Sequence, residues 1–120
     1  MPRAAVLAAL ALSLGAVPAL AQPDGKQLYE LQCNFCHADE SLGPSLTGVA
    51  GRKIGSTSFD YSEAMKAKGA ADATWTDEEL DAFLKAPSTH TPGTKMMMSV
   101  GDDANRAAII AYLKTLKSAD

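Results

Sequence analysis

Residues 33–37 read Cys-Asn-Phe-Cys-His, and no other stretch of the chain carries so specific a chemical pattern. Two cysteines three positions apart, with a histidine directly after the second, are typical of a c-type haem attachment site. Each thiol can add to one vinyl group of a haem, and the adjacent imidazole can then bind the iron as its proximal ligand. We therefore expect one covalently attached haem c, bound through Cys33 and Cys36, with His37 as an iron ligand.

Two other uses of a Cys-x-x-Cys pair compete with this interpretation. The pair could form a disulfide, or it could be the redox centre of a thioredoxin-like protein. Haem attachment is favoured because His37 follows directly and no strand–helix–strand pattern surrounds the motif. The chain contains two cysteines in all, so no disulfide framework competes for them.

His37 would bind one face of the iron. If the haem is to transfer electrons without opening a coordination site, the other face needs a second ligand from the protein. The candidates are four methionines and one histidine, namely Met65, Met96, Met97, Met98 and His90. A thioether sulfur raises the reduction potential, and Met/His ligation is the pattern of electron-transfer haems. A run of methionines is more often core filler or a flexible surface, however. Periodicity does not choose among the three neighbours.

The first 21 residues resemble a secretory signal peptide. One positive charge at Arg3 precedes an apolar run over residues 4–21, which ends in Ala-Leu-Ala before Gln22. An uncleaved membrane anchor is the alternative, and the apolar length is borderline for one. Pro18 and the alanine-rich end favour cleavage. We expect residues 1–21 to be removed on export to the periplasm, which leaves residues 22–120 as one small domain without a membrane span.

Size and charge limit what this domain can do. A domain of this length is near the lower limit for burying an adequate core unaided, and a covalently held haem would enlarge that core. The formal net charge of the whole chain is −3, and it becomes −4 when Arg3 leaves with the signal peptide. Nucleic-acid binders need a basic footprint, so nucleic acid is excluded as a partner. We expect a monomer.

The elements around the motif are predicted to be helices joined by loops. A first helix is expected to begin at Asp24 and to carry Leu28 and Leu31 toward the cysteines. Residues 41–60 contain four glycines and read as a long loop, for which wrapping a prosthetic group is one reason. A short helix is expected over residues 62–68, stopped by Gly69.

Two further helices complete the predicted domain. Residues 76–79, Thr-Asp-Glu-Glu, have the pattern of a capping box, and an apolar helical face follows until Pro87 ends the helix. The last helix is expected to begin near Asp102 or Asp103, with a buried stripe made by Ile109, Leu113 and Leu116. No convincing alternating strand is present, so the predicted fold class is all-α with irregular loops.

The order of these motifs resembles that of class I cytochromes c, in particular mitochondrial cytochrome c and its small bacterial relatives. The resemblance rests on Cys33–His37, Gly43–Leu46, Gly51–Lys53, Phe59–Tyr61, Trp75, Pro92–Met96 and Ile110–Lys114. It covers nearly the whole mature chain. It implies the class I cytochrome c fold, in which helices and loops wrap around one covalently bound haem.

The resemblance also assigns roles to individual residues. It implies Met96 as the distal iron ligand, because Met96 closes the Pro-Gly-Thr-Lys-Met segment. It implies that the carbonyl of Pro44 accepts the second ring N–H of His37, a bond that orients the imidazole. It places Arg52, Tyr61 and Trp75 at the haem propionates, which must be paired or hydrogen-bonded when buried. His90 is then left without an iron role, as a solvated loop histidine.

Several residues depart from the mitochondrial pattern. Phe83 replaces a tyrosine near the distal methionine, and Met65 replaces a polar asparagine, so the distal side is expected to be more apolar. Gly25, Tyr29 and Tyr112 do match the family, at the place where the first and last helices cross. Lys26 and Lys95 are the lysines expected near the haem edge, whereas Gln32, Asp102 and Asp103 occupy positions where the mitochondrial relative carries lysine.

The resemblance implies a soluble periplasmic one-electron carrier that is not an enzyme. Its expected partners are redox proteins such as a quinol-oxidising cytochrome complex, a terminal oxidase or a photosynthetic reaction centre. Three other functions remain open at this point: the electron-accepting subunit of a periplasmic dehydrogenase, a weak haem peroxidase, and a haem-based gas sensor. No acid–base constellation supports catalysis by the chain itself, since His90 is the only histidine besides His37.

Overall fold

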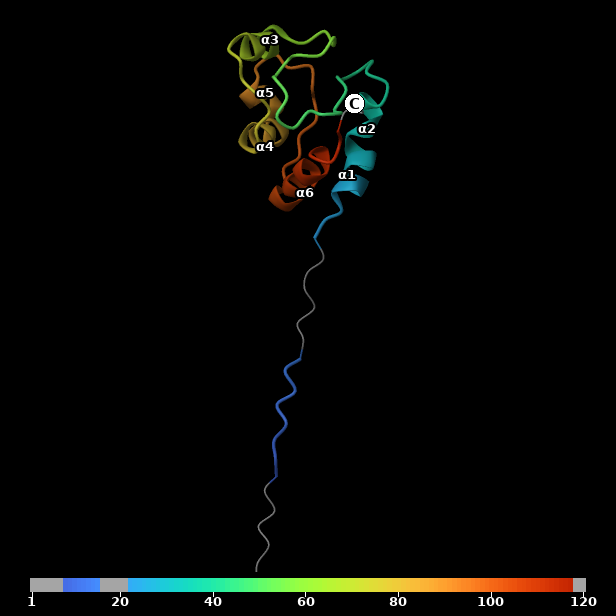
Figure 1. Cartoon of the computed structure of the whole chain (residues 1–120), viewed down its shortest axis with the longest axis vertical. Helices are drawn as coiled ribbons and strands as arrows, with labels where there is room; N and C mark the ends of the chain where they lie inside the picture. Colours follow the sequence, from blue (N-terminus) through green and yellow to red (C-terminus); the bar gives the residue numbers. More distant parts are fainter. Residues whose placement is uncertain (1–7, 16–21, 118–120) are drawn as a thin grey trace, which may run out of the picture.

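The computed structural model describes residues 8–15 and 22–117. Its helices are α1 (Gly25–Gln32), α2 (Asn34–His37), α3 (Glu63–Ala70), α4 (Asp77–Lys85), α5 (Pro87–His90) and α6 (Asp103–Leu113), as shown in Figure 1. Within the described residues the β-type pairing is limited to an isolated bridge between Lys53 and Thr74. The predicted all-α fold with irregular loops is confirmed.

The segment that precedes the domain is described only in part. Residues 8–15 form an exposed stretch without regular structure that runs away from the helices (Figure 1). The two ends of the predicted signal peptide, residues 1–7 and 16–21, lie outside the described residues. In the part of the chain that is described, no helix has both the length and the apolar character needed to cross a membrane.

Helices α1 and α6 cross at close range, as the sequence predicts. Asp24 caps α1, its carboxylate accepting hydrogen bonds from the backbone N–H groups of Lys26 and Gln27. A Cβ atom on Gly25 would lie 2.1 Å from the carbonyl oxygen of Ala108 on α6, so only glycine permits this approach. The rings of Tyr29 and Tyr112 pack beside the crossing, with centroids 5.1 Å apart. Leu31, expected to face the cysteines, is instead 73% exposed.

Helix α3 is longer than predicted because Gly69 does not end it. Ser62 caps its first turn by accepting a hydrogen bond from the backbone N–H of Met65. Gly69 lies inside the helix, where a Cβ atom would stand 2.4 Å from the carbonyl oxygen of Ile54. Gly69 therefore allows α3 to pack closely against the preceding loop, and it does not end the helix.

Helices α4 and α5 form a consecutive pair around Pro87. Thr76 caps α4 and accepts from the N–H of Glu79 at 3.2 Å, which is one half of the predicted capping box. The Glu79 side chain does not form the other half, because its carboxylate is hydrogen-bonded to His90. Pro87 ends α4 as predicted and also occupies the first turn of α5, a helix that the sequence did not predict.

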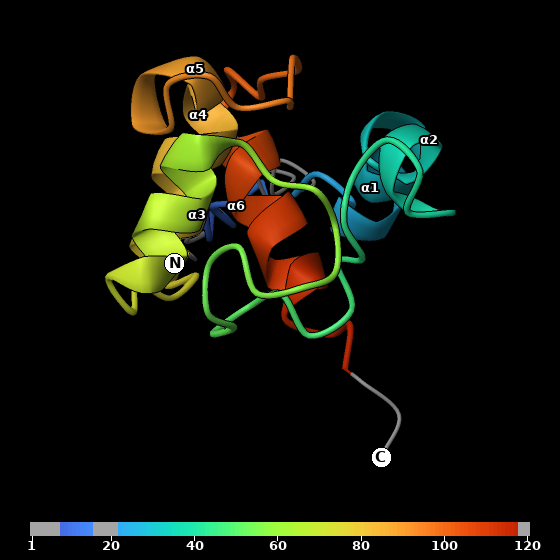
Figure 2. The same cartoon turned by 90° about the horizontal axis from the view of Figure 1, so that it is seen from above.

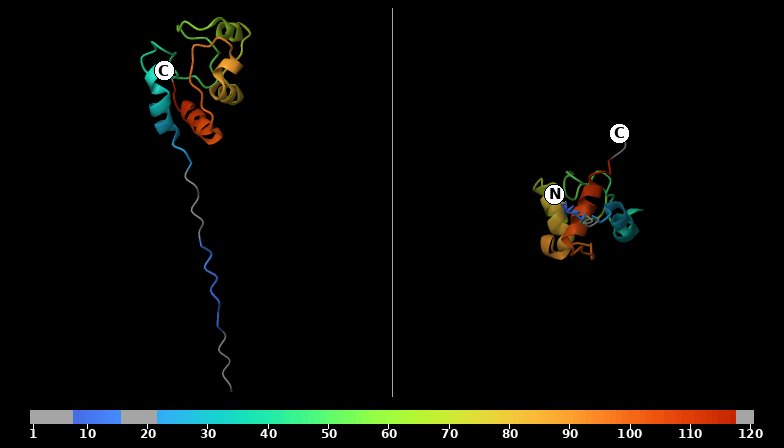
Figure 3. Two further views of the ribbon diagram at one scale, coloured as in Figure 1. Left: turned by 180° about the vertical axis from the view of Figure 1, so that it is seen from behind. Right: turned by 90° about the horizontal axis from the view of Figure 1, so that it is seen from below.

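Helix α6 lies in the middle of the domain. Viewed from above in Figure 2, α1 and α2 lie on one side of it and α3 and α4 on the other, and the view from behind in Figure 3 agrees. Asp102 caps α6 and accepts from the N–H of Asn105 at 2.8 Å. Ile109 and Leu113 are buried, as predicted for its apolar stripe. The two sides of the domain are therefore held against one helix, and the segments after α2 and α5 close the space between them.

Candidate haem site

A cavity of about 520 Å³ lies among α1, α2, α3, α4, α6 and the loops that join them. All eight predicted site residues border it: Cys33, Cys36, His37, Pro44, Arg52, Tyr61, Trp75 and Met96. Most of the remaining wall is apolar and includes Leu46, Val49, Met65, Leu80, Phe83 and Ile109. A large apolar cavity with a few polar groups is the usual form of a cofactor site.

The cysteine pair and His37 reach this cavity because the chain turns tightly at α2. The backbone N–H groups of Cys36 and His37 both donate to the carbonyl of Cys33, at 3.3 and 3.2 Å. Cys33 is 6% exposed, and burial raises the pKa of its thiol to about 11. A thioether carries no charge, so attachment of haem at Cys33 suits this apolar wall.

The orientation of the His37 ring is set by the loop that follows α2. Its Nδ1 lies 2.7 Å from the carbonyl oxygen of Pro44, to which Nδ1–H donates. Nε2 is then the nitrogen left to bind a metal, because a neutral imidazole carries a single ring hydrogen. Burial lowers the pKa of His37, and the Pro44 hydrogen bond partly opposes that shift. The neutral ring is the form that binds a metal.

Gly43 gives the His37 ring its space. A Cβ atom at position 43 would lie 2.7 Å from Cε1 and 2.8 Å from Nδ1 of His37. We therefore expect Gly43→Ala to push the imidazole off the Pro44 carbonyl and to lower the free energy of unfolding of the haem protein by about 1–3 kcal/mol. Denaturant unfolding measures this loss, and a titration of the reduction potential reports the disturbed ligand.

Gly101→Ala is the matched control for that variant, since a Cβ atom at position 101 meets no described atom within 4 Å. Equal losses of stability in the two variants, with unchanged potentials, would refute the role given to Gly43.

Arg52 supplies an observation that tests whether a haem fits the cavity. Its Nη1 and Nη2 donate to the carbonyls of Thr47 and Ser45, at 3.1 and 2.9 Å. Its Nε is buried and, among the described residues, has no hydrogen-bond partner. Burial lowers the pKa of the guanidinium, although the charge interaction with Tyr61 opposes this shift. A buried donor on a cationic group at the cavity wall fits a propionate carboxylate.

The candidate distal ligands differ in their surroundings. Met65, Met96, Met97 and Met98 all border the cavity, but Met97 is 89% exposed and Met65 belongs to α3. His90 does not border the cavity, and it is not the solvated loop histidine that was expected. It ends α5, and only 10% of its side chain is exposed. The prediction was wrong because the short helix α5, which the sequence did not predict, turns the ring inward between Trp75 and Phe83.

The contacts of His90 therefore involve two residues, Glu79 and Thr91, whose role at the site the sequence does not predict. Glu79 and Thr91 bind the two ring nitrogens of His90. The incomplete capping box was the one available signal, since it leaves the Glu79 carboxylate free for another partner.

Comparison with known proteins agrees with this geometry. The family model described as Cytochrome c matches residues 23–117. The chain is 45% identical to the cytochrome c of Tetrahymena pyriformis over 96 residues, which is 77% of this chain and 85% of that protein. It is 39% identical to the cytochrome c2 of Rhodopila globiformis, over 86% of this chain and 100% of that protein.

Solved structures give the same result. The ferricytochrome c2 of Rhodopseudomonas palustris superimposes with a TM-score of 0.70 at 32% identity, covering 79% of this chain and 100% of that one. Cytochrome cH of Methylobacterium extorquens gives a TM-score of 0.67 at 35% identity, over 78% of this chain and 99% of that one.

The chain is thus a member of the cytochrome c family, of class I. With family membership come one c-type haem, covalently attached through Cys33 and Cys36, and the function of an electron carrier rather than an enzyme.

Proposed function

We propose that residues 22–120 form a periplasmic one-electron carrier, exported by a cleaved signal peptide over residues 1–21, whose haem iron is bound by His37 and Met96. The single observation that carries the proposal is the cavity, which gathers the attachment cysteines, the oriented His37 ring and the methionine segment in one apolar chamber. The bacterial cytochromes c2 among its relatives support the periplasmic assignment.

Met96 is the distal ligand in this proposal. It belongs to residues 92–98, which we call the strap, and its backbone N–H donates to the Thr94 hydroxyl at 3.3 Å. The side chain of Lys95 ties the strap to the opposite loop, because its Nζ donates to the backbone carbonyl and the carboxylate of Asp60 at 2.5 and 3.0 Å. A thioether held this way would supply the distal ligand of the iron and would raise its reduction potential.

The residues around the cavity prepare the site for electron transfer. When bound, the haem supplies an iron that alternates between its ferric and ferrous states. The apolar wall would keep water away from the bound haem, so few solvent molecules would need to reorient when the charge of the iron changes. Arg52, Tyr61 and Trp75 would hold the propionates; the Tyr61 hydroxyl already bonds the Thr57 hydroxyl at 2.5 Å. His37 and Met96 would be the two protein ligands of the iron, so no ligand would have to bind or leave during electron transfer.

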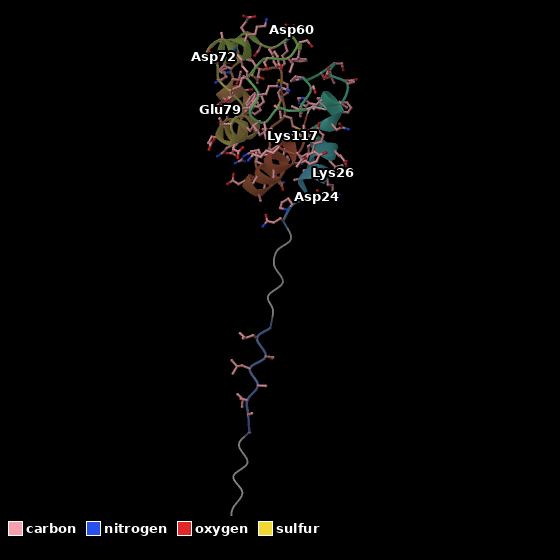
Figure 4. The ribbon with its side chains drawn as sticks, in the orientation of Figure 1. Asp24, Lys26, Asp60, Asp72, Glu79 and Lys117 are labelled. Carbon is pink, nitrogen blue, oxygen red and sulfur yellow. The ribbon has the colours of Figure 1, made fainter. Side chains whose placement is uncertain are left out.

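Redox proteins are the proposed partners: a quinol-oxidising cytochrome complex as donor, and a terminal oxidase or photosynthetic reaction centre as acceptor. The mouth of the cavity offers an apolar rather than a cationic surface to them. Leu42 and Met97 border the cavity and are 58% and 89% exposed, and Phe35 within the cysteine motif is 84% exposed. Lys26 lies at the end of α1 that is farther from Asp60, as the labels in Figure 4 show. It is therefore not close to Lys95, which pairs with Asp60.

We expect electron transfer from this protein to depend weakly on ionic strength. Lys95 is the lysine that borders the cavity, and Asp60 pairs with it. The rate of oxidation by hexacyanoferrate(III), an anion, should fall by less than about threefold between low and high salt, because screening of a cationic ring would lower it roughly 10- to 1000-fold. Stopped-flow measurements with a cationic oxidant serve as the control. A steep fall in the hexacyanoferrate(III) rate with salt would contradict the prediction.

Cell fractionation tests the proposed function as a whole. The coloured protein should appear in the periplasmic fraction, begin at Gln22, carry one haem in its intact mass, and be reversibly reduced by one electron. Protein that retains residues 1–21 in the membrane fraction would contradict the export proposal. A reduced form that rapidly binds carbon monoxide would contradict ligation by Met96.

A further inference from the structure

His90 is a nearly buried histidine that the electron-carrier function does not use. Its ring stacks on Trp75, with centroids 6.1 Å apart and planes inclined by 22°. It also meets the edge of Phe83, with centroids 5.5 Å apart. Trp75 and Phe83 both border the haem cavity, so His90 packs directly behind the cavity wall.

Both ring nitrogens of His90 are bonded. Nε2 lies 2.5 Å from the Glu79 carboxylate, and Nδ1 lies 2.8 Å from the Thr91 hydroxyl. A carboxylate only accepts, so Nε2–H donates to Glu79, and in the neutral ring Nδ1 then accepts from the Thr91 hydroxyl. Thr91 is fully buried, with 0% of its surface exposed, whereas 41% of the Glu79 side chain is exposed at the edge of α4 (Figure 4).

Hydrogen bonds continue from Thr91 to Met96. The carbonyl of Thr91 accepts from the N–H of Thr94 at 3.0 Å, and the hydroxyl of Thr94 accepts from the N–H of Met96 at 3.3 Å. The chain of contacts thus leads from a surface carboxylate on α4, through a buried ring, to the backbone of the proposed iron ligand.

The segment that follows the strap, at Val100 and Gly101, is anchored separately. The N–H of Val100 donates to the carbonyl of Leu84 at 2.8 Å, and the buried Arg106 donates to the carbonyls of Val100 and Gly101, both at 3.0 Å. The strap is therefore a loop with two fixed ends, and Glu79, His90 and Thr91 fix the end that precedes Met96.

We propose that Glu79, His90 and Thr91 act as a latch that positions the strap and so keeps the Met96 sulfur at the iron. These are positioning residues, since none of them borders the cavity. The inference rests on the proposed ligation by Met96. Opening the latch would free the first turn of the strap, and Met96 would leave the iron more often.

The rate at which the ferric haem protein binds cyanide tests the latch, because cyanide must wait for Met96 to leave the iron. Thr91→Val keeps the shape of the buried side chain and removes the hydroxyl; His90→Phe keeps the stacked ring and removes both ring hydrogen bonds. Thr91→Val should bind cyanide about tenfold faster than the parent, which is the effect of losing one buried hydrogen bond, and His90→Phe, which loses two, should bind it at least that much faster. Glu79→Gln, which retains an acceptor, should bind it roughly threefold faster.

Asp77→Asn is the matched control. Asp77 lies on the same helix and pairs with Lys114, the residue that follows α6, at 2.5 Å, away from the strap. Its cyanide rate should match that of the parent protein even when its unfolding midpoint falls. Latch variants that accelerate cyanide binding no more than Asp77→Asn would overturn the proposal.

Two further measurements keep the result unambiguous. If Thr91→Val and His90→Phe do not accumulate, hydrogen exchange at the Met96 amide should still be faster in Glu79→Gln than in the parent protein, and equal exchange would overturn the latch. Ferric parent protein that lacks the sulfur-to-iron charge-transfer band would refute ligation by Met96 itself. A present band with unchanged latch variants would refute only the latch.

Discussion

The double variant Cys33→Ala, Cys36→Ala is expected to lose its haem and, with it, its fold. Without the two thioethers the haem can dissociate, and the apolar cavity would have to remain open, collapse or fill with water. Keeping an apolar cavity of about 520 Å³ empty costs at most roughly 12 kcal/mol at about 24 cal/mol per Å³, because part of the cavity opens to solvent. The total stability of a domain is about 5–15 kcal/mol, so the haem-free chain should be largely unfolded.

Circular dichroism and the dispersion of amide resonances in the purified double variant measure this outcome. The parent sequence, produced in cells without cytochrome maturation, is the control and should behave in the same way, because it loses the haem without losing either thiol. A haem-free chain of either kind that unfolds cooperatively at a temperature close to that of the haem protein would contradict the prediction.

Met96→His is expected to lower the reduction potential by a few tenths of a volt. Imidazole stabilises ferric iron relative to a thioether, and axial ligands change haem potentials over a range of roughly 0.8 V. The same variant should lose the sulfur-to-iron charge-transfer band of the ferric protein. Spectroelectrochemical titration measures both effects on one sample.

The other methionines at the cavity provide the controls. Met65→Leu, Met97→Leu and Met98→Leu keep an apolar side chain of similar volume and should retain the band, with potentials close to that of the parent. Loss of the band in one of these variants, together with its survival in Met96→His, would move the distal ligand to that residue.

The parts of the site that the sequence predicts are those set by local chemistry. The spacing of Cys33, Cys36 and His37 fixes their relation to one another, because a single tight turn brings all three to one wall. Helix starts were also predictable at Asp24, Thr76 and Asp102, since an N-cap depends only on the next three residues.

The parts that escaped prediction depend on contacts between distant segments. The sequence predicts a helix end at Gly69, but Gly69 lies inside α3 and leaves space for the carbonyl of Ile54, which belongs to an earlier loop. His90 looked like a loop residue because nothing near it in the sequence shows that Trp75 and Glu79 surround it. The sequence around His90 does not show that its ring reaches Glu79 on α4, 11 residues earlier in the chain.

A crystal structure of the ferric mature protein tests the central claim most directly. The account predicts one haem in the cavity, joined to Cys33 and Cys36, with iron bonded to Nε2 of His37 on one face and to the sulfur of Met96 on the other. Iron bonded to a different methionine or to His90, or an open distal face, would contradict it.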